Sequence, residues 1–194
     1  SADQQTWRSE FKGGAAPAPA VKAPAKRAAE TVKGTPKVEF VAPQNKWYVQ
    51  YQSAAEGEVL VTIGDKKESV YVLGCIGASV RVSGKCNGII VDNCKKTSVT
   101  FDTVMASCEL VNCKSVRVEC KERCASVAID KTDGAVVALS KTSMDAEILS
   151  AKSSEMNVQW YDDSDELVER PIPEQYVHKI VGTTITAQVS DLYS

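Results

Sequence analysis

Apolar residues recur along the middle of the chain with a regular 19-residue period. Two series lie two residues apart and begin at Val61 and Ile63, and two more lie about half a period away and begin at Tyr51 and Val72. The 23 positions, all of them apolar, are Val61, Val80, Val99, Val118, Val137, Met156; Ile63, Val82, Phe101, Cys120, Leu139, Val158; Tyr51, Val70, Ile89, Cys108, Val127, Ala146; and Val72, Val91, Leu110, Ile129, Ile148. Paired apolar positions with one mixed residue between them indicate a β-strand that buries one face.

Each 19-residue unit therefore supplies two short strands and leaves no room for a crossover helix. Strands at a constant repeat stack most simply as the coils of a parallel β-helix, and the handedness rule for parallel connections predicts a right-handed one. No proline occurs between residues 44 and 170, which fits uninterrupted regular structure over that range. We predict an all-β fold in which each coil is one 19-residue unit.

Small and polar residues also recur at this spacing between the predicted strands. They suit tight corners, because Gly and Asn tolerate unusual backbone angles. These corner positions are Gly74, Asn93, Asn112, Lys131 and Ser150, followed by Cys75, Cys94 and Cys113. We expect the cysteines to fill corners as reduced thiols and to play no chemical role, and we place Cys86, Met105 and Cys124 in a further column.

The alternating stretch that ends the chain has no place in the 19-residue register. Ile185, Ala187 and Val189 alternate there with polar residues. Such a strand must either fold back on the last coil or cross to a second copy, and a self-complementary twofold dimer is the commonest closed solution. We therefore predict a homodimer formed through about residues 176–194, with Ile180, Ile185, Ala187 and Val189 as candidate contacts.

Composition narrows the classes of function. The 194 residues carry 23 Lys+Arg against 25 Asp+Glu, a net charge of −2, which argues against a dedicated nucleic-acid binder. No apolar run reaches the roughly 20 residues of a membrane span, and no signal segment is visible, so we expect a cytoplasmic protein without membrane insertion. Seven Cys without a CxxC pair and the single His178 offer no zinc site and no catalytic set. We expect no enzyme activity, no metal and no cofactor.

Residues 1–36 differ in composition from the rest. They hold nine Ala, four Pro and six basic against three acidic residues, so we predict a disordered tail or linker before a β-helix domain at 37–194. Thr6–Phe11 within the tail could anchor a partner, but we favour an ordinary tail with an incidental Trp7.

Four ordered motifs resemble the C-terminal domain of the cyclase-associated proteins: Val91–Lys96, Ile129–Gly134, Ser150–Val158 and Pro171–Tyr176. The resemblance covers about residues 37–190. It implies a right-handed parallel β-helix that dimerises through exchanged C-terminal strands. It also implies binding to monomeric actin with a preference for the ADP form, exchange of ADP for ATP, cooperation with cofilin on actin, and a cytoskeletal location.

The candidate actin-binding residues lie at corners or inside the matching motifs. They are Lys95, Lys96, Lys114, Lys131, Asp133, Lys152, Ser153, Ser154, Glu155 and Asn157. We expect Ile76, Lys95, Lys114, Asp133 and Lys152 to form one column. Like charges about 5 Å apart repel, so such a column needs solvent, a counter-charge or an acidic partner. A solvated corner without a partner is the alternative.

Other interpretations stay open. The helical and proline-rich regions that precede this domain in the family are not visible, so the chain is either a fragment or a short member, and cyclase association is not carried over. A carbohydrate-active β-helix would need clustered Asp, Arg or Lys in a groove, whereas the outward columns here scatter their carboxylates. A domain like tubulin cofactor C would need a Gln-x-Arg corner, and none occurs between residues 37 and 194. A purely structural dimerisation module is a further alternative.

Overall fold

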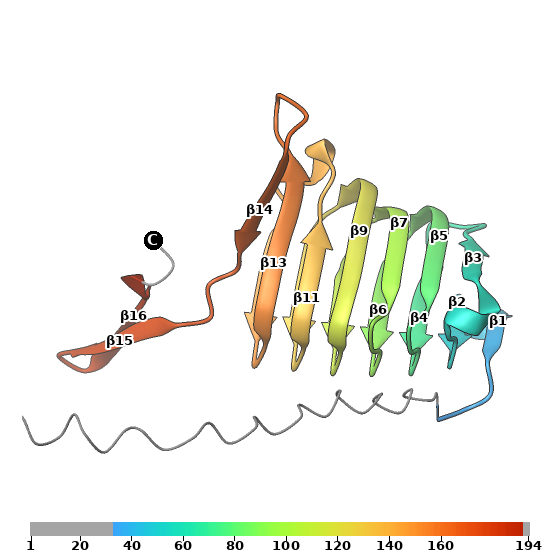
Figure 1. Ribbon diagram of the computed structural model, residues 1–194, viewed down its shortest axis with the longest axis horizontal. Coiled ribbons are helices and arrows are strands. Elements are labelled where there is room, and N and C mark those ends of the chain that lie inside the picture. Colours follow the sequence, from blue (N-terminus) through green and yellow to red (C-terminus); the bar gives the residue numbers. More distant parts are fainter. Residues whose placement is uncertain (1–32, 192–194) are drawn as a thin grey trace, which may run out of the picture.

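Two facing parallel sheets wind through the middle of the molecule as a β-solenoid (Figure 1). The computed structural model describes residues 33–191. The first sheet, called sheet A, has the order β1 (Lys37–Val41), β2 (Lys46–Gln50), β4 (Ser69–Leu73), β6 (Gly88–Asp92), β8 (Cys108–Val111), β10 (Ser126–Asp130) and β12 (Glu147–Ala151). Sheet B has the order β14 (Leu167–Pro171), β13 (Ser154–Tyr161), β11 (Asp133–Ala138), β9 (Lys114–Cys124), β7 (Ser98–Val104), β5 (Ser79–Cys86) and β3 (Glu58–Thr62). The prediction of an all-β parallel solenoid with 19-residue coils is confirmed.

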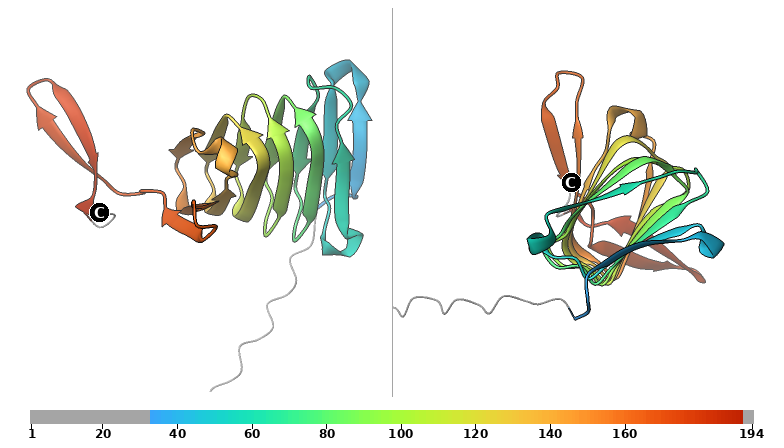
Figure 2. Two further views of the ribbon diagram at one scale, coloured as in Figure 1. Left: turned by 90° about the horizontal axis from the view of Figure 1, so that it is seen from above. Right: turned by 90° about the vertical axis from the view of Figure 1, so that its right-hand side faces the viewer.

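The core lies between the two sheets (Figure 2). Strands such as β4 alternate buried and partly exposed residues, as the period-two pattern predicts. The largest fully buried side chains include Phe101, Ile89, Leu110 and Ile129, and most of the others are valines. Valine suits this core because its branched side chain packs well on a pleated surface.

The register differs from the predicted one in the first and last coils. Val80, Val99, Val118 and Val137 stack at the predicted spacing, but Val80 pairs with Val59 in the first coil. In the last coil Val137 pairs with Val158 and Ala135 with Met156. On sheet B both of these coils therefore carry two extra residues.

Sheet A also departs from the 19-residue period at its ends, by four residues in the first coil and by two in the last. Val72 pairs with Val49, and Val127 pairs with Ile148. The predicted column members Tyr51 and Ala146 lie outside the strands. Each misplaced column still consisted of apolar residues, because an insertion of an even number of residues keeps every side chain on the same face of its strand.

All seven cysteines are buried and free. Burial raises the pKa of Cys86 and of Cys124 to about 11, and that of Cys108 well above its ordinary value. At neutral pH these groups are inert thiols that pack as small hydrophobes. The residue between Cys86 and Cys124 is Val104 rather than the predicted Met105, because irregularities in β5–β7 and β7–β9 shift the register there.

The ends of the solenoid are closed by antiparallel strands that the repeat did not reveal. β1 pairs with β2 at one end, and β14 pairs with β13 at the other, so the acidic stretch 162–166 is the turn of a hairpin. Three short 3-10 turns complete the connections: η1 (Ala42–Gln44), η2 (Ala54–Glu56) and η3 (Lys141–Ser143).

A separate two-stranded hairpin follows the solenoid and projects away from it (Figures 1 and 2). β15 (Tyr176–Val181) pairs with β16 (Thr184–Val189), and every residue of both strands is exposed. The predicted terminal strand exists, but within the chain it pairs with β15 instead of folding back on the last coil. His178 lies in β15, outside the repeat as expected.

Residues 1–32 and 192–194 lie outside the described part of the chain, and with them Thr6–Phe11 and most of the predicted tail. Among residues 33–191 no helix is long and apolar enough to cross a membrane.

Candidate functional site

A four-residue corner follows each strand of sheet A from β4 onward and leads the chain into sheet B. The corners are residues 74–77, 93–96, 112–115, 131–134 and 152–155. In the last three corners, the final two residues are also the first two residues of β9, β11 and β13. Their backbone groups bond from coil to coil: Lys95 N–H donates to Cys75 C=O at 2.9 Å, and Lys114 N–H donates to Cys94 C=O at 2.9 Å. The side chains of each corner position therefore stack in straight rows along the solenoid.

The first and last residues of each corner have a left-handed backbone. The first row has positive φ at Gly74, Asn93, Asn112, Lys131 and Lys152. The last row has positive φ at Gly77, Lys96, Ser115, Gly134 and Glu155. A left-handed residue that is not glycine costs of order 1 kcal/mol or more. The corners keep this geometry because hydrogen bonds to the adjacent coils hold it on both sides.

The second residue of each corner points inward and forms a hydrogen-bonded ladder. Cys75 N–H donates to Cys94 Sγ at 3.4 Å, Cys113 N–H to Thr132 Oγ1 at 3.2 Å, and Thr132 N–H to Ser153 Oγ at 3.1 Å. Hydrogen bonds with Cys113 and Cys75, together with burial, raise the pKa of the Cys94 thiol. Ser153 also donates to the Ala151 carbonyl at 2.8 Å, so its hydroxyl belongs to this ladder and not to the outer surface.

The third residue of each corner points outward and carries the charged row that the sequence suggested. Backbone bridges join Ile76 to Lys95 and Lys95 to Lys114, and Lys114 pairs with Asp133 and Asp133 with Ser154. Ser154 therefore takes the place expected for Lys152, because the last coil has two extra residues.

An ion pair interrupts the repulsion along this row. Lys114 Nζ lies 2.8 Å from Asp133 Oδ2, and Ser154 Oγ donates to Asp133 Oδ1 at 2.9 Å. These two hydrogen bonds hold the pKa of Asp133 below its ordinary value. Both side chains are at least half exposed, so the pair is screened by water and remains accessible to a partner.

The remaining candidate residues flank this row. Lys96 and Glu155 lie in the last left-handed row, and Lys131 and Lys152 lie in the first. All four side chains are exposed. Asn157 lies beyond the corner on β13, where it pairs with Val136 and Pro171. The structure thus brings nine of the ten candidates to one surface, counting Asn157 at its edge, and turns Ser153 inward.

Sequence reasoning missed Ser115 and Gly134, which complete the last left-handed row. Their spacing from Lys96 was visible in the sequence, but neither residue type points to binding.

Among the described residues no group of three or more His, Cys, Asp or Glu could hold a metal ion. The corner is a stiff, mainly basic surface with acidic groups at Asp133 and Glu155, which suits recognition of a protein surface.

Comparison with known proteins identifies the family. The profile described as "Adenylate cyclase associated (CAP) C terminal" matches residues 34–192, most of the chain. The chain belongs to this family. The CAP proteins regulate actin and are not enzymes.

Curated CAP proteins resemble about three quarters of the chain. The adenylyl cyclase-associated protein of Dictyostelium discoideum is 42% identical over 148 residues, 75% of this chain and 32% of that protein. Human adenylyl cyclase-associated protein 1 is 37% identical over 147 residues, 76% of this chain and 31% of that protein. The chain therefore spans about a third of the length of these relatives.

A solved structure shares the fold. The cyclase-associated protein from Cryptosporidium parvum superposes with a TM-score of 0.77 at 26% identity, covering 82% of this chain and 98% of that one. The resemblance noted from the four motifs is confirmed.

Proposed function

We propose that this CAP domain binds monomeric actin, prefers the ADP form, and promotes exchange of ADP for ATP. The observation that carries the proposal is membership of an actin-binding family across residues 34–192. The contact surface that we propose is the corner, with Lys95, Lys96, Lys114, Asp133 and the neighbouring candidates. Its exposed lysines suit an acidic partner surface, and attraction over this surface would weaken as salt is added.

Acceleration of nucleotide release requires unequal binding to two states of actin. A protein that binds the state with loosened nucleotide more tightly shifts actin toward that state by the ratio of the two affinities. A solenoid suits this task because each coil is bonded to its neighbours by continuous parallel ladders, so the corner can hold a partner without deforming itself. Actin loaded with cofilin is a further expected partner, and the cytoplasm is the expected place of action.

We also propose that the protein forms a homodimer through its hairpin. One face of the hairpin carries the predicted dimerisation residues, Ile180, Ile185, Ala187 and Val189. Ile180 is 83% exposed and Ile185 is 72% exposed, which is unusual for isoleucine unless a partner covers it. The outer edge of β12 has no neighbouring strand among the described residues, and Leu149 on that strand is 55% exposed, so a hairpin from a second copy could add to sheet A there.

The test is release of a fluorescent nucleotide from ADP-actin, with and without the whole chain. We expect faster release, and a weaker effect on ATP-actin. If release is unchanged and the protein does not bind actin in a gel-shift or sedimentation assay, only the hairpin's dimerisation would remain as a function. If the chain instead accelerates GTP hydrolysis by tubulin, that result would favour a role like that of tubulin cofactor C.

A further inference from the structure

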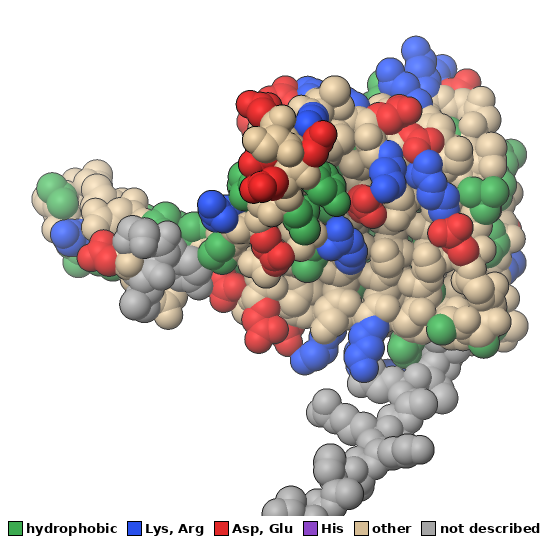
Figure 3. All heavy atoms as spheres, turned by 45° about the horizontal axis from the view of Figure 1, so that its top comes forward, with side chains coloured by type: hydrophobic (Ala, Val, Ile, Leu, Met, Phe, Trp, Pro, Cys, Tyr) green, Lys and Arg blue, Asp and Glu red, His purple; other side chains and the backbone are tan. Residues whose placement is uncertain are grey.

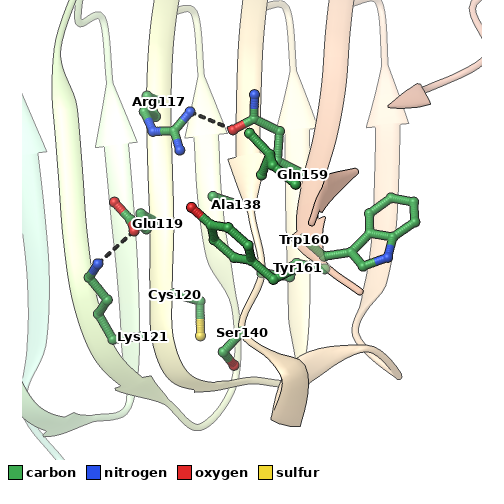
Figure 4. Close-up of a pocket in the computed structure, with 11 residues that line it drawn as sticks. Arg117, Glu119, Cys120, Lys121, Ala138, Ser140, Gln159, Trp160 and Tyr161 are labelled. Atoms are coloured by element: carbon green, nitrogen blue, oxygen red, sulfur yellow. Dashed lines mark hydrogen bonds and ion pairs between the residues drawn. The ribbon is translucent and has the colours of Figure 1, made fainter. Parts of the chain in front are cut away.

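A small pocket opens on the outer face of sheet B, away from the charged corner. Its volume is about 220 Å³, and its walls come mainly from β9, β11 and β13 (Figure 4). The residues that line it include Arg117, Glu119, Lys121, Ala138, Gln159 and Tyr161. Ala138 lies at the middle of this group, and its small side chain leaves the space open between the larger side chains on either side (Figure 4).

One wall of the pocket carries a positive charge that no carboxylate neutralises. Within residues 33–191, Arg117 makes no ion pair, and its guanidinium donates to the amide oxygen of Gln159 at 2.8 Å. The amide nitrogen of Gln159 donates in turn to Glu169 Oε2 at 2.8 Å. By contrast, the guanidinium groups of Arg81 and Arg123 each pair with an aspartate. A partly buried guanidinium with spare donors is a good site for a carboxylate, since Arg can bind one through two parallel hydrogen bonds.

The opposite wall is apolar and exposed. Tyr161 and Leu167 pair across β13 and β14, and they are 55% and 54% exposed. Figure 4 shows the ring of Tyr161 lying between Ala138 and Ser140. Figure 3 shows a group of hydrophobic side chains among charged ones near the end of the solenoid from which the hairpin leaves. The pocket therefore joins one unneutralised positive charge to an apolar surface that would gain from burial.

The size of the pocket distinguishes between kinds of ligand. Sites for whole small molecules usually enclose about 300–1,000 Å³ and bury most of the ligand, whereas this pocket is smaller and opens on a flat sheet face. It has room for one aliphatic side chain. A peptide can supply that side chain and a neighbouring carboxylate, while its backbone remains on the surface.

The strand register fixes the spacing of such a peptide. Arg117 pairs with Val136, and Ala138 lies two residues further along the adjacent strand. Diagonal positions of this kind are about 7–8 Å apart. Residues i and i+2 of an extended peptide point to the same side about 7 Å apart. We propose that the pocket binds an extended segment of a partner protein that places Asp or Glu on Arg117 and an aliphatic residue, two positions away, over Ala138.

Chemical shifts of the whole chain, labelled with ¹⁵N, test this proposal directly. The probe is the capped peptide acetyl-Gly-Glu-Gly-Leu-Gly-amide, titrated to about 5 mM because one charge and one side chain support binding only near the millimolar range. We expect saturable shifts at the amides of Arg117, Ala138 and Tyr161. Replacing Glu of the probe by Gln, or Leu by Gly, should weaken binding about tenfold or abolish it, because each change removes one of the two anchors.

Matched variants locate the site on the protein. Ala138→Leu fills the pocket and should weaken binding at least tenfold, whereas Val136→Leu, at the neighbouring outward position on β11 outside the pocket, should not. Arg117→Gln should remove the preference for Glu over Gln in the probe, and Lys85→Gln on β5 should leave it. A melting curve for each variant checks that the fold is kept.

Three outcomes would overturn the proposal. The first is the absence of shifts, or shifts that Ala138→Leu does not change. The second is equal saturation by free 4-methylpentanoate, which would assign the pocket to a small acid. The third is movement of the same amides with protein concentration alone, which would assign it to a second copy of the chain.

Discussion

Lys114 and Asp133 form an ion pair of 2.8 Å between successive coils. They are the third and fourth members of the outward row, which begins with Ile76 and Lys95. The pair neutralises one lysine of the corner and leaves the exposed Lys96 beside it. Reversing charge at Lys95 and Lys96 to Glu should therefore change the sign of the corner without touching the core. We expect binding of ADP-actin to weaken at least tenfold, measured by anisotropy of labelled actin, with no change in the oligomeric state.

Two controls make this first prediction specific. The double change Lys66→Glu and Lys67→Glu reverses an exposed lysine pair in the loop between β3 and β4, outside the corner, and should leave actin binding unchanged. Lys85→Glu reverses one exposed lysine on β5, outside the corner, and should also leave actin binding unchanged. Equal loss in both double variants would mean that only net charge matters and that the corner is not the contact surface.

The hairpin gives a second prediction. Ile180 and Ile185 face each other across β15 and β16 and are largely exposed. Ile180→Glu with Ile185→Glu places two carboxylates opposite each other on the apolar face, so any dimer that buries this face should dissociate. We expect light scattering at micromolar concentration to show a dimer for the original chain and a monomer for the variant.

The control for the hairpin is Lys179→Glu, which changes charge on its other face, where Lys179 pairs with Thr186. That variant should remain a dimer. A monomeric mass for the unchanged protein would contradict the prediction.

The repeat predicted the core because buried and partly exposed residues alternate along strands such as β4 and β6. It failed where coils change length. Insertions of two residues before Val80 and before Val158 keep the apolar face inward, so a test based on apolarity alone gave no sign of them. The same insertion placed Lys152 in the wrong row, and Ser154 lies beside Asp133 instead.

The ends of the solenoid could not be predicted from the period because each occurs once. β14 pairs with β13 through side chains that follow no repeat, and β15 separates completely from the solenoid. Likewise, Ser153 lies inside a matching motif, yet its hydroxyl bonds inward to Thr132 N–H. Only the positions of the neighbouring coils distinguish an inward from an outward corner residue.

The inward ladder supports a third prediction. Thr132 is 1% exposed, and its hydroxyl accepts from Cys113 N–H at 3.2 Å and donates to Asp130 C=O at 3.1 Å. Thr132→Val keeps the shape of the side chain but leaves the buried Cys113 N–H without its acceptor. The loss costs about 1–3 kcal/mol of unfolding free energy. Urea unfolding should show this loss, and Thr132→Ser, which keeps the hydroxyl, should recover most of it. Equal stability of the Val and Ser variants would mean that shape alone holds the corner.

The last prediction concerns Asp102 on β7 and the dependence of stability on pH. Burial opposes ionisation of this carboxyl, but hydrogen bonds from the Arg81 guanidinium and, at 2.7 Å, from Gly84 N–H outweigh it and hold the pKa below its ordinary value. Because the folded pKa is lower than the unfolded value of about 3.9, the stabilisation is present above pH 4 and is lost as the pH falls through the folded pKa. The partners are partly exposed to solvent, so the contribution is about 1 kcal/mol.

Asp102→Asn should therefore lower the free energy of unfolding by about 1 kcal/mol at neutral pH and by much less at a pH low enough to protonate Asp102 itself in the folded protein. Urea unfolding at several pH values measures the loss of unfolding free energy at neutral and at low pH. A carboxyl NMR titration gives the pKa of Asp102 directly. Asp163→Asn, at an exposed position in the turn between β13 and β14, is the matched control and should leave the neutral-pH stability unchanged. A loss of the same size at both pH values would show that Asp102 acts through packing or hydrogen-bond geometry and not through its charge.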